Sequence, residues 1–225
     1  MIIINHDHSL YRKRWENIRE NRFNGAFFYS KEICKTMIPL VETDRNWITV
    51  NIPGVGIDHS IVFIHNNLHP EHYDHLAKYK DLVLVCGIEE TVSRVSHLGK
   101  AIVLPLSIDV ENVMTYRREK TKEVAFVGRR AKRKGIYLPP GIDYIEGLPR
   151  TKLLPAMAEY KKVYAVGRTA IEAKVLGCEI LPYDPRFPDP SRWKVVDTKE
   201  AAVILQEKLD LIDHTGYAHN LREKT

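Results

Sequence analysis

The chain has 225 residues, of which 44% are hydrophobic and 28% are charged, and its formal net charge is +5. This composition is typical of a soluble globular protein that is long enough to bury one large core or two small ones. No apolar run approaches the about 20 residues that cross a bilayer, and the N-terminal apolar run precedes its basic residues, the reverse of a secretory signal. We therefore expect no transmembrane segment and no signal peptide.

The three cysteines, Cys34, Cys86 and Cys178, are widely spaced and form no CxxC pair. Cys86 and Cys178 lie at the ends of apolar runs, where buried and reduced thiols are common. The sequence therefore predicts free thiols and a reducing, cytoplasmic location.

Short apolar runs bounded by turn residues recur along the first half of the chain, and their Val and Ile content predicts buried strands. These predicted strands are Ile2–Ile4, Gly25–Tyr29, Trp47–Ile52, Ile61–Ile64, Leu82–Cys86 and Ala101–Leu104. The segments between them predict helices at Tyr11–Glu20, Tyr73–Lys78 and Glu89–Leu98. Strands that alternate with helices favour an α/β fold with a parallel sheet covered on both faces.

The second half of the chain repeats this alternation after the charged stretch "TYRREKTKE", which resembles a linker. The predicted strands are Val124–Val127, Lys162–Val166, Glu179–Pro182 and Trp193–Val196, and the predicted helices are Ala170–Leu176 and Ala201–Ile212. We therefore expect two Rossmann-like domains with a cleft between them. The N-terminal domain would span residues 1–108, the linker 109–120 and the C-terminal domain 121–225.

Positive charge is concentrated in one segment of the chain. Residues 117–134 contain nine Lys or Arg and two Glu, a net charge of +7, so the rest of the chain carries −2. A local excess of this kind requires a local explanation, such as an anionic ligand or a solvated surface.

A first candidate ligand site follows the predicted strand "VAFV". Gly128 ends this strand, and Arg129 and Lys134 come shortly after it. In an open α/β sheet, ligands bind beyond the carboxyl ends of the strands, where a glycine lets the backbone approach and Arg and Lys bind phosphate oxygens. An isolated basic cluster is also typical of a solvated loop.

A second strand end lies in "YAVGRTAIEAKVLGCEIL", where a strand leads into Gly167, Arg168 and Thr169 and then into a helix that contains Glu172. The first turn of a helix presents unpaired N–H groups and the positive end of its dipole to an anion. Glu172 would lie about one turn inside the helix, close enough to the sheet edge to accept hydrogen bonds from sugar hydroxyls. In an ordinary strand–turn–helix unit, Glu172 would instead face solvent.

Three motifs in this region together resemble one enzyme family. "AFVGRRAKRKG" resembles the VGR-x4-KG element that opens the C-terminal domain of GT-B glycosyltransferases, particularly the retaining group that includes sucrose and glycogen synthases. "GRTAIEAKVLGCEIL" is similar to the EAMACGxPVI element of that group, and "LPLSIDVENV" resembles its segment at the interdomain hinge. The three motifs cover residues 102–184, and the resemblance implies a GT-B fold and glycosyltransferase activity.

The resemblance also implies roles for individual residues. Arg129 and Lys134 would hold the diphosphate of a nucleotide-sugar donor, and Glu172 would bind its ribose. His65, in "VFIHNNLHPEHY", would face the donor sugar. The other residues that the resemblance places at the donor are Gly128, Gly167, Arg168 and Thr169.

The chain departs from the family pattern in two respects. The first Glu of the family, eight residues before its "EA", is Tyr164 here. The stretch between "KG" and "EA" is also much shorter than usual, which predicts that one or two β–α units of the second domain are absent. An inactive or unusual relative therefore stays open.

The N-terminal half offers two candidate catalytic residues, His65 and Asp7. His65 is also the kind of histidine that is satisfied structurally at a strand end. Asp7, in "IINHDHS" after the first predicted strand, is flanked by His6 and His8 and could act as a general base toward an acceptor hydroxyl.

We expect no metal site. His69, His72 and His75 are three residues apart, a spacing that does not stay on one face of a helix. The sequence has no DxD pair, and GT-B folds typically use basic residues and a helix end in place of a metal. No cofactor is expected beyond the donor itself.

We therefore predict a cytoplasmic glycosyltransferase that moves a sugar from a nucleoside diphosphate sugar, with UDP-glucose as the expected donor, to an acceptor hydroxyl. The alternatives are a nucleotide-sugar epimerase of the same architecture and a non-catalytic nucleotide-binding or nucleic-acid-binding protein. The acceptor could be a glycan, a lipid-linked group or a polyanion such as DNA with a modified base. The polyanion is considered because one diphosphate leaves these cations unexplained: Arg117, Arg118, Lys120, Arg130, Lys132 and Arg133.

Overall fold

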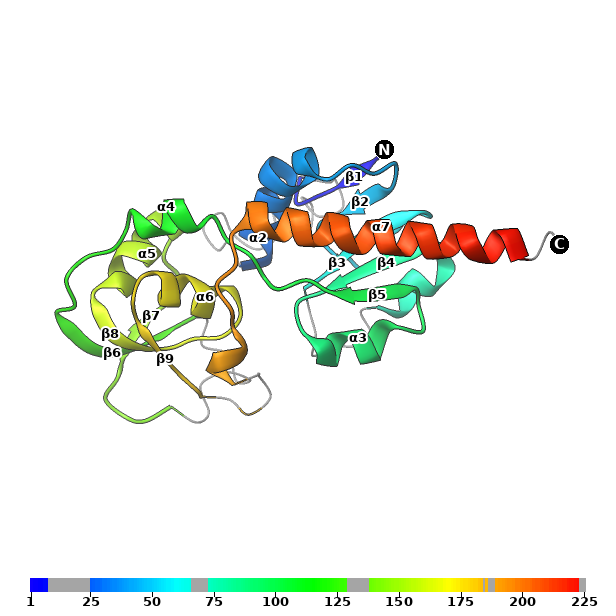
Figure 1. Cartoon of the computed structure of the whole chain (residues 1–225). Helices are drawn as coiled ribbons and strands as arrows, with labels where there is room; N and C mark the ends of the chain where they lie inside the picture. Colours follow the sequence, from blue (N-terminus) through cyan, green and yellow to red (C-terminus); the bar gives the residue numbers. More distant parts are fainter. Residues whose placement is uncertain (8–24, 66–72, 129–137, 184, 186–188, 223–225) are drawn as a thin grey trace. The chain divides into compact units, whose positions relative to one another are not determined.

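The structure is a computed structural model that describes residues 1–7, 25–65, 73–128, 138–183, 185 and 189–222 (Figure 1). The predicted helix Tyr11–Glu20 lies outside these residues. The described strands form one five-stranded and one four-stranded sheet, and both sheets are parallel. The prediction of an α/β fold with parallel sheets is therefore confirmed.

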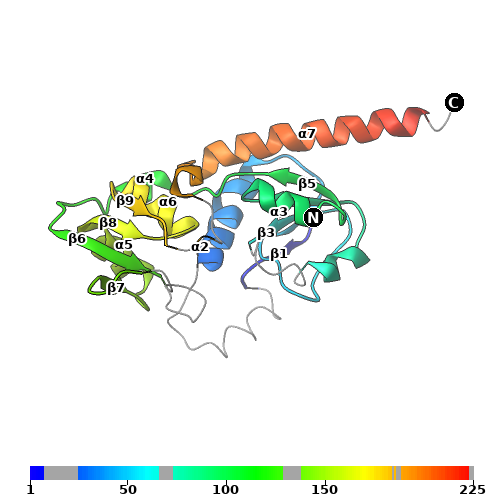
Figure 2. The same cartoon turned by 90° about the horizontal axis from the view of Figure 1, so that it is seen from below.

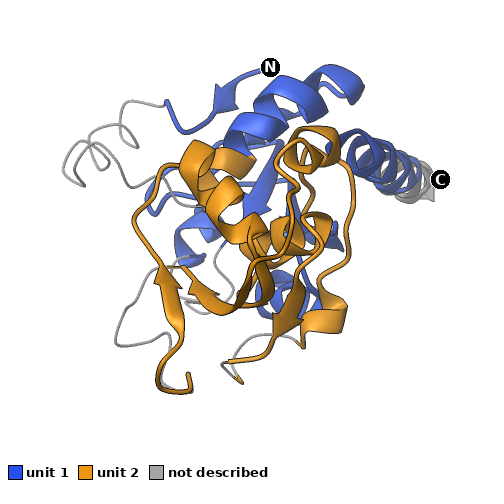
Figure 3. Ribbon diagram, turned by 90° about the vertical axis from the view of Figure 1, so that its left-hand side faces the viewer, with its two compact units in different colours: residues 1–13, 30–105, 198–225 blue, residues 14–29, 106–197 orange. Residues whose placement is uncertain are grey.

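The chain divides into two compact units whose bounds differ from the predicted domains (Figure 3). Unit 1 consists of Met1–Lys13, Ser30–Pro105 and Thr198–Thr225. Unit 2 consists of Arg14–Tyr29 and Leu106–Asp197. The C-terminal segment, expected in the second domain, thus belongs to unit 1.

The sheet of unit 1 is built on two fully buried central strands. In β3 (Ser60–Ile64) and β4 (Leu82–Cys86) every residue is buried, because a parallel strand covered on both faces must be apolar along its length. The outer strands are shorter or more exposed: β1 (Ile3–Ile4), β2 (Asn46–Ile48) and β5 (Lys100–Val103). All five lie within or overlap predicted strands, so these predictions are confirmed.

The strand order in unit 1 is β1-β2-β3-β4-β5, the order of the sequence. A doubly wound Rossmann sheet instead reverses its strand order near the middle, and the ligand binds at that reversal. Unit 1 is therefore an α/β unit with a parallel sheet whose order contains no reversal among its described strands.

The predicted strand Gly25–Tyr29 is wrong, because these residues form a helix. Helix α2 (Gly25–Glu32) continues into a π-helical turn, Ile33–Met37, and a 3-10 turn, Ile38–Leu40. Tyr29, Ile33 and Met37 are buried at intervals of four residues, which is the spacing of one helical face. A short apolar run such as "GAFFY" cannot be assigned to strand or helix by periodicity alone.

Two shorter helical segments complete the described connections of unit 1. The 3-10 segment Asp74–Lys78 and helix α3 (Glu89–Val95) both lie inside predicted helices. Thr91 and Val95 are the buried residues of α3, which contacts β4 and β5.

The C-terminal helix α7 (Thr198–Arg222) packs on unit 1 because of a narrow apolar stripe. Ala201, Ala202, Leu205 and Leu209 are buried, and α7 contacts the Ile33–Met37 turn. Polar contacts add to this: the Gln206 side chain accepts from the backbone N–H of Glu42 and donates to its carbonyl, at 2.7 and 3.2 Å. This packing explains why the helix does not belong to the second unit.

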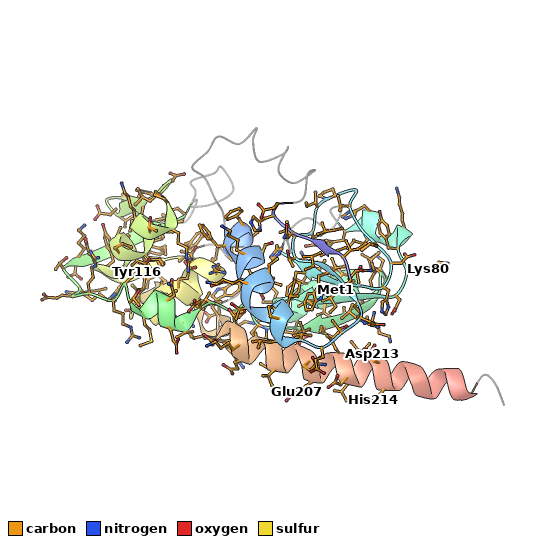
Figure 4. All side chains as sticks on the ribbon, turned by 90° about the horizontal axis from the view of Figure 1, so that it is seen from above. Met1, Lys80, Tyr116, Glu207, Asp213 and His214 are labelled. Carbon is orange, nitrogen blue, oxygen red and sulfur yellow. The ribbon has the colours of Figure 1, made fainter. Side chains whose placement is uncertain are left out.

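A buried guanidinium joins α7 to the sheet of unit 1. Arg45 is only 3% exposed, and its Nη2 donates to Asp213 Oδ1 of α7 at 2.8 Å. Its Nη1 donates to Asp81 Oδ2 at 3.1 Å, at the start of β4. Figure 4 shows Asp213 on the side of α7 that faces unit 1, whereas Glu207 and His214 point away from it.

A histidine between two carboxylates extends this cluster. His59 contacts Asp81 through Nδ1 at 2.5 Å and Asp44 through Nε2 at 3.0 Å. The hydrogen bonds that His59 donates to the carboxylates of Asp81 and Asp44 raise its pKa, while the contact with His59 lowers the pKa of Asp44. His59 and Asp81 both have a φ of +52°, a conformation unfavourable for a residue with a side chain. The ion pair therefore holds two strained residues at the starts of β3 and β4.

Among its described residues, unit 2 contains a four-stranded sheet, three short helices, the first part of α2 and a 3-10 turn at Pro190–Arg192 (Figures 1 and 2). The strands are β6 (Lys122–Val127), β7 (Asp143–Ile145), β8 (Tyr160–Tyr164) and β9 (Glu179–Leu181). The helices are α4 (Val110–Met114), α5 (Arg150–Ala158) and α6 (Arg168–Val175). Strands β6, β8 and β9 and helix α6 confirm the predictions, whereas β7, α4 and α5 were not predicted.

Two predictions about the ends of unit 2 are wrong. The predicted linker 109–120 contains α4, which is capped by Asp109 and packs against α6. Residues 193–196, predicted as a strand, are irregular; only Asp197 forms an isolated bridge, with Ile108. Both segments are held by contacts that are distant in sequence.

The His59 cluster predicts a pH-dependent stability. Because the folded-state pKa of His59 is raised above 6.5, its stabilisation is complete below that pH and is lost as pH rises through the raised value. Denaturant unfolding between pH 5.5 and 9 should show this loss in the native protein and not in His59→Asn. Asn tolerates positive φ, so the backbone is preserved. Parallel pH profiles for the two proteins would contradict the role of His59.

Candidate functional site

The strand order of unit 2 creates a point where the connections diverge. The order is β7-β6-β8-β9, so the chain leaves β6 toward β7 on one side and later returns to form β8 on the other. In open α/β sheets, ligands bind beyond the carboxyl ends of the two strands at such a reversal. Here those strands are β6 and β8, which end at Val127 and Tyr164.

A glycine follows each of these two strands. Phe126 of β6 pairs with Tyr164 of β8. Gly128 lies two residues after Phe126, and Gly167 lies three residues after Tyr164. Gly128 has a φ of +151° and Gly167 a φ of +60° with ψ −137°, a conformation essentially restricted to glycine. No atom of the described residues lies within 4 Å of where a Cβ of Gly167 would be, so backbone conformation, not crowding, requires this glycine.

Helix α6 begins directly after Gly167 and carries a buried ion-pair network. Glu172 is 2% exposed, and its Oε1 accepts from Nε of Arg168 at 2.7 Å. The same oxygen also accepts from Nη1 of Arg150, the first residue of α5. One carboxylate oxygen thus holds guanidinium groups from the first turns of two helices.

Arg150 is also fixed from its other side. Its guanidinium carbon lies 5.3 Å from the ring centroid of Phe28, in the part of α2 that belongs to unit 2. A planar guanidinium over an aromatic ring is a favourable cation–π arrangement. The Arg150 side chain is 16% exposed, so it reaches solvent while its orientation is set by Phe28 and Glu172.

Neither sequence interpretation of Glu172 describes its surroundings. The residue does not face solvent, and its described contacts are with arginines at the sheet edge. Thr169 is half-buried at the start of the same helix. Gly128 follows β6, and Gly167, Arg168, Thr169 and Glu172 follow the adjacent strand β8. Their role in binding a donor stays a prediction.

Sequence reasoning missed Arg150. It follows β7 through the turn "EGLP", but β7 is a three-residue strand of which only Ile145 is buried. Without that strand, no signal placed Arg150 at the carboxyl edge of a sheet. Arg129 and Lys134, the predicted phosphate ligands, lie outside the described residues, so their role stays a prediction.

The basic residues before β6 have structural partners. Nζ of Lys120 donates to the carbonyls of Ala158 and Leu176 at 2.9 and 2.8 Å, at the C-terminal ends of α5 and α6. Nε of Arg117 donates to the Val175 carbonyl at 2.6 Å. A cation that binds the last carbonyls of a helix satisfies unpaired acceptors and complements the helix dipole.

The described part of the basic segment, residues 117–128, has further protein partners. Arg118 and Lys122 both pair with the carboxylate of Glu159, at 3.2 and 2.8 Å. These residues lie at the amino end of β6, and Gly128 lies at the carboxyl end. Six residues of strand separate the two ends by about 20 Å. Three of the cations left unexplained by the sequence, Arg117, Arg118 and Lys120, have protein partners.

In unit 1, Asp7 and His65 both lie at the carboxyl edge of the sheet. Asp7 follows β1 and His65 follows β3, two strands apart, which corresponds to about 10 Å. Nε2 of His65 donates to the Thr49 carbonyl at 2.6 Å, as expected of a histidine satisfied at a strand end. Asp7 is exposed and accepts from Nε2 of His6 at 2.9 Å.

His6 is the better-positioned base of this pair. It is 8% exposed, and burial, together with the charge of Lys31, lowers its pKa although Asp7 acts in the opposite direction. The imidazole is therefore neutral at physiological pH, and a neutral imidazole accepts a proton. Asp7, which the sequence analysis proposed as the base, is the ion-pair partner of His6, and its catalytic role stays a prediction.

A buried hydroxyl pair lies beside this edge. Oγ of Ser30 and Oγ1 of Thr49 are 2.7 Å apart, and Sγ of Cys34 lies 3.8 Å from the same Thr49 oxygen. Burial raises the pKa of Cys34, so its thiol is protonated and a poor nucleophile. Cys86 and Cys178 are buried free thiols, as predicted.

The described residues show neither a metal-binding cluster nor a membrane-spanning helix. Among them, no group of three or more His, Cys, Asp or Glu side chains is arranged to hold a metal ion. His75 is described, whereas His69 and His72 lie outside these residues. No described helix combines the length and the apolar character that crossing a membrane requires.

Comparisons with known proteins add no relative. No protein family matches the sequence, and no curated protein or solved structure matches it at the level required for significance. The resemblance to GT-B glycosyltransferases therefore rests on the three motifs and their positions.

The conformation of Gly167 predicts the effect of a single methyl group. Gly167→Ala forces a side chain into a strained backbone region, so we expect unit 2 to lose about 1–3 kcal/mol of stability. Gly147→Ala, also at positive φ but in the turn after β7, is the matched comparison. Chemical denaturation measures both. A neutral effect at Gly167 would show that α6 can begin with ordinary backbone geometry.

The contacts of Lys120 predict a structural role. Lys120→Met keeps the length of the side chain and removes both hydrogen bonds to helix carbonyls, so it should destabilise the protein by about 1–3 kcal/mol. Arg118→Met, which removes a surface ion pair, should change stability by less than about 1 kcal/mol. Equal effects in denaturant unfolding would contradict the distinction.

Proposed function

We propose that unit 2 binds a nucleoside diphosphate sugar at the carboxyl ends of β6 and β8 and that the protein is a glycosyltransferase. The observation that carries this proposal is the reversal of strand order between β6 and β8, with glycines at both strand ends. A diphosphate requires close backbone approach, N–H donors and cations. Gly128 and Gly167, the start of α6 and the two arginines Arg150 and Arg168 meet these requirements.

Transfer chemistry needs two contributions from the protein. The leaving diphosphate gains negative charge, which nearby guanidinium groups stabilise electrostatically. The acceptor hydroxyl must lose a proton, and a neutral imidazole such as that of His6, which contacts Asp7, can accept one. His65 donates a hydrogen bond to the Thr49 carbonyl, so we assign it a structural role at this edge of the sheet and not the role of the base.

The acceptor in this proposal is a hydroxyl of a glycan or a related small molecule. A polyanionic acceptor such as DNA has less support than the count of basic residues suggested, because Arg117, Arg118 and Lys120 have structural partners. The donor sugar and base are proposed as glucose and uridine, in line with the family that the motifs resemble.

A second candidate function is non-catalytic nucleotide binding. The strand order of unit 1 favours it, since the described strands of this sheet show no reversal at which a second substrate would bind. Such a protein would be stabilised by the nucleotide without turning it over.

Ligand-induced stabilisation tests nucleotide binding, which both candidate functions require. At a concentration of about 100 times the Kd, UDP or UDP-glucose should stabilise the folded protein by about 2.7 kcal/mol and raise its unfolding temperature. UDP, GDP, ADP and their sugars should be compared. If none of them raises the unfolding temperature, nucleotide binding is wrong.

Product analysis then separates the classes. A transferase releases UDP from UDP-glucose only when a suitable acceptor is added, apart from slow hydrolysis. An epimerase converts the donor alone into a second nucleotide sugar, and a binding protein returns it unchanged. His6→Gln should abolish transfer and leave UDP binding intact if His6 is the base.

A further inference from the structure

The surroundings of Glu172 point to a role different from the one its motif implies. A carboxylate that binds ribose must offer its oxygens to hydroxyl donors. Glu172 is 2% exposed, and the oxygen Oε1 already accepts from two guanidinium groups. Charge-assisted hydrogen bonds to arginine are stronger than those to a neutral hydroxyl, so a sugar would have to displace the better partner.

We propose that Glu172 is a positioning residue that holds Arg150 and Arg168 at the carboxyl edge of unit 2, where these two arginines bind the diphosphate. This inference rests on the proposed function, because it assumes a ligand with a diphosphate at that edge. It assigns a ligand-binding role to Arg150.

The geometry of Arg150 supports this assignment. A guanidinium has five N–H donors, and Arg150 gives one, from Nη1, to Glu172. Within the described part of the chain, Glu172 is its sole ion-pair partner. Phe28 covers one face of the guanidinium, which fixes its plane and leaves its edge as the donor surface.

The position of the pair supports it further. Arg150 is the first residue of α5 and Arg168 the first of α6, and α5 and α6 pack against each other. Neither helix has an acidic residue in its first turn, so no carboxylate there would repel a bound anion. Glu172 lies one turn further along α6, which places it behind Arg168 as seen from the helix start.

The matched contrast is Glu159, at the opposite edge of the same sheet. Its carboxylate also holds two cations, Arg118 and Lys122, but these side chains are half-exposed and lie at the amino end of β6. Ligands do not bind at the amino edge of a parallel sheet. Glu159→Gln therefore changes a carboxylate with two cationic partners without touching the proposed site.

The experiment compares three probes on the full-length protein: inorganic pyrophosphate, UDP and uridine. Glu172→Gln should weaken pyrophosphate and UDP binding by a similar factor, about ten-fold or more, and leave uridine binding unchanged. Arg150→Gln should do the same, and Arg150→Lys, which keeps the charge but loses the fork, should restore part of the affinity. Glu159→Gln should change none of the three. Calorimetry measures the tight ligands, and ligand-observed NMR measures uridine.

A double variant tests whether Glu172 acts through Arg150. Because the carboxylate would work by orienting the arginine, Glu172→Gln combined with Arg150→Gln should lose less affinity than the sum of the single losses, in free energy. Strict additivity would show two independent contacts with the ligand and overturn the positioning role.

The remaining outcomes are separable. Weaker uridine binding with unchanged pyrophosphate binding in Glu172→Gln would make Glu172 a ribose ligand, which overturns this inference and keeps the proposed function. Equal loss for all three probes would make Glu172 a structural residue only, and unchanged affinity for all of them would remove both residues from the site. Failure of the native protein to bind UDP or pyrophosphate would overturn the proposed function, and this inference with it.

Discussion

The parallel pairing of β6 with β8 is the constraint on which the candidate site of unit 2 depends. Parallel strands end at the same edge, and the detour of the chain through β7 makes the connections after β6 and β8 leave in different directions. Gly128 and Gly167 then follow adjacent strands, although 39 residues separate them in the sequence. The start of α6 follows β8, whereas the start of α5 follows β7, which pairs with β6 on its other side.

Each unit buries an arginine in an ion-pair cluster, but the ratio of cations to carboxylates is opposite in the two clusters. In unit 1, one guanidinium, Arg45, meets the carboxylates of Asp81 and Asp213 and ties α7 to the sheet. In unit 2, one carboxylate, Glu172, meets two guanidinium groups. The first arrangement pairs a buried cation with two carboxylates and stabilises the packing of α7 on the sheet. The second gathers cations at an edge where a parallel sheet binds ligands, which is why we connect it with function.

The basic segment illustrates how misleading linear charge density is. Nine cations within 18 positions suggest a patch, yet strand β6 occupies Lys122–Val127 in the middle of the segment. Lys120 and Arg117 donate hydrogen bonds to carbonyls at helix ends, so these two cations stabilise the fold. Gly128, at the carboxyl end of β6, is where the described part of the segment ends. Charge becomes informative about a partner only after the strands are placed.

The sequence by itself determined the buried strands and the motif positions. β3 and β4 were predictable because a strand covered on both faces must be apolar, and β6 because its second half is apolar and buried. The turn at Gly167 was predictable because a strand that leads into a helix often needs backbone angles that glycine adopts. Strand β7, which exposes two of its three residues, leaves no such signal. The unit to which α7 belongs, the order of the strands and the pairing of Arg150 with Glu172 were decided by the tertiary structure alone. They depend on contacts between residues far apart in the sequence, and local patterns carry no information about which distant residues will meet.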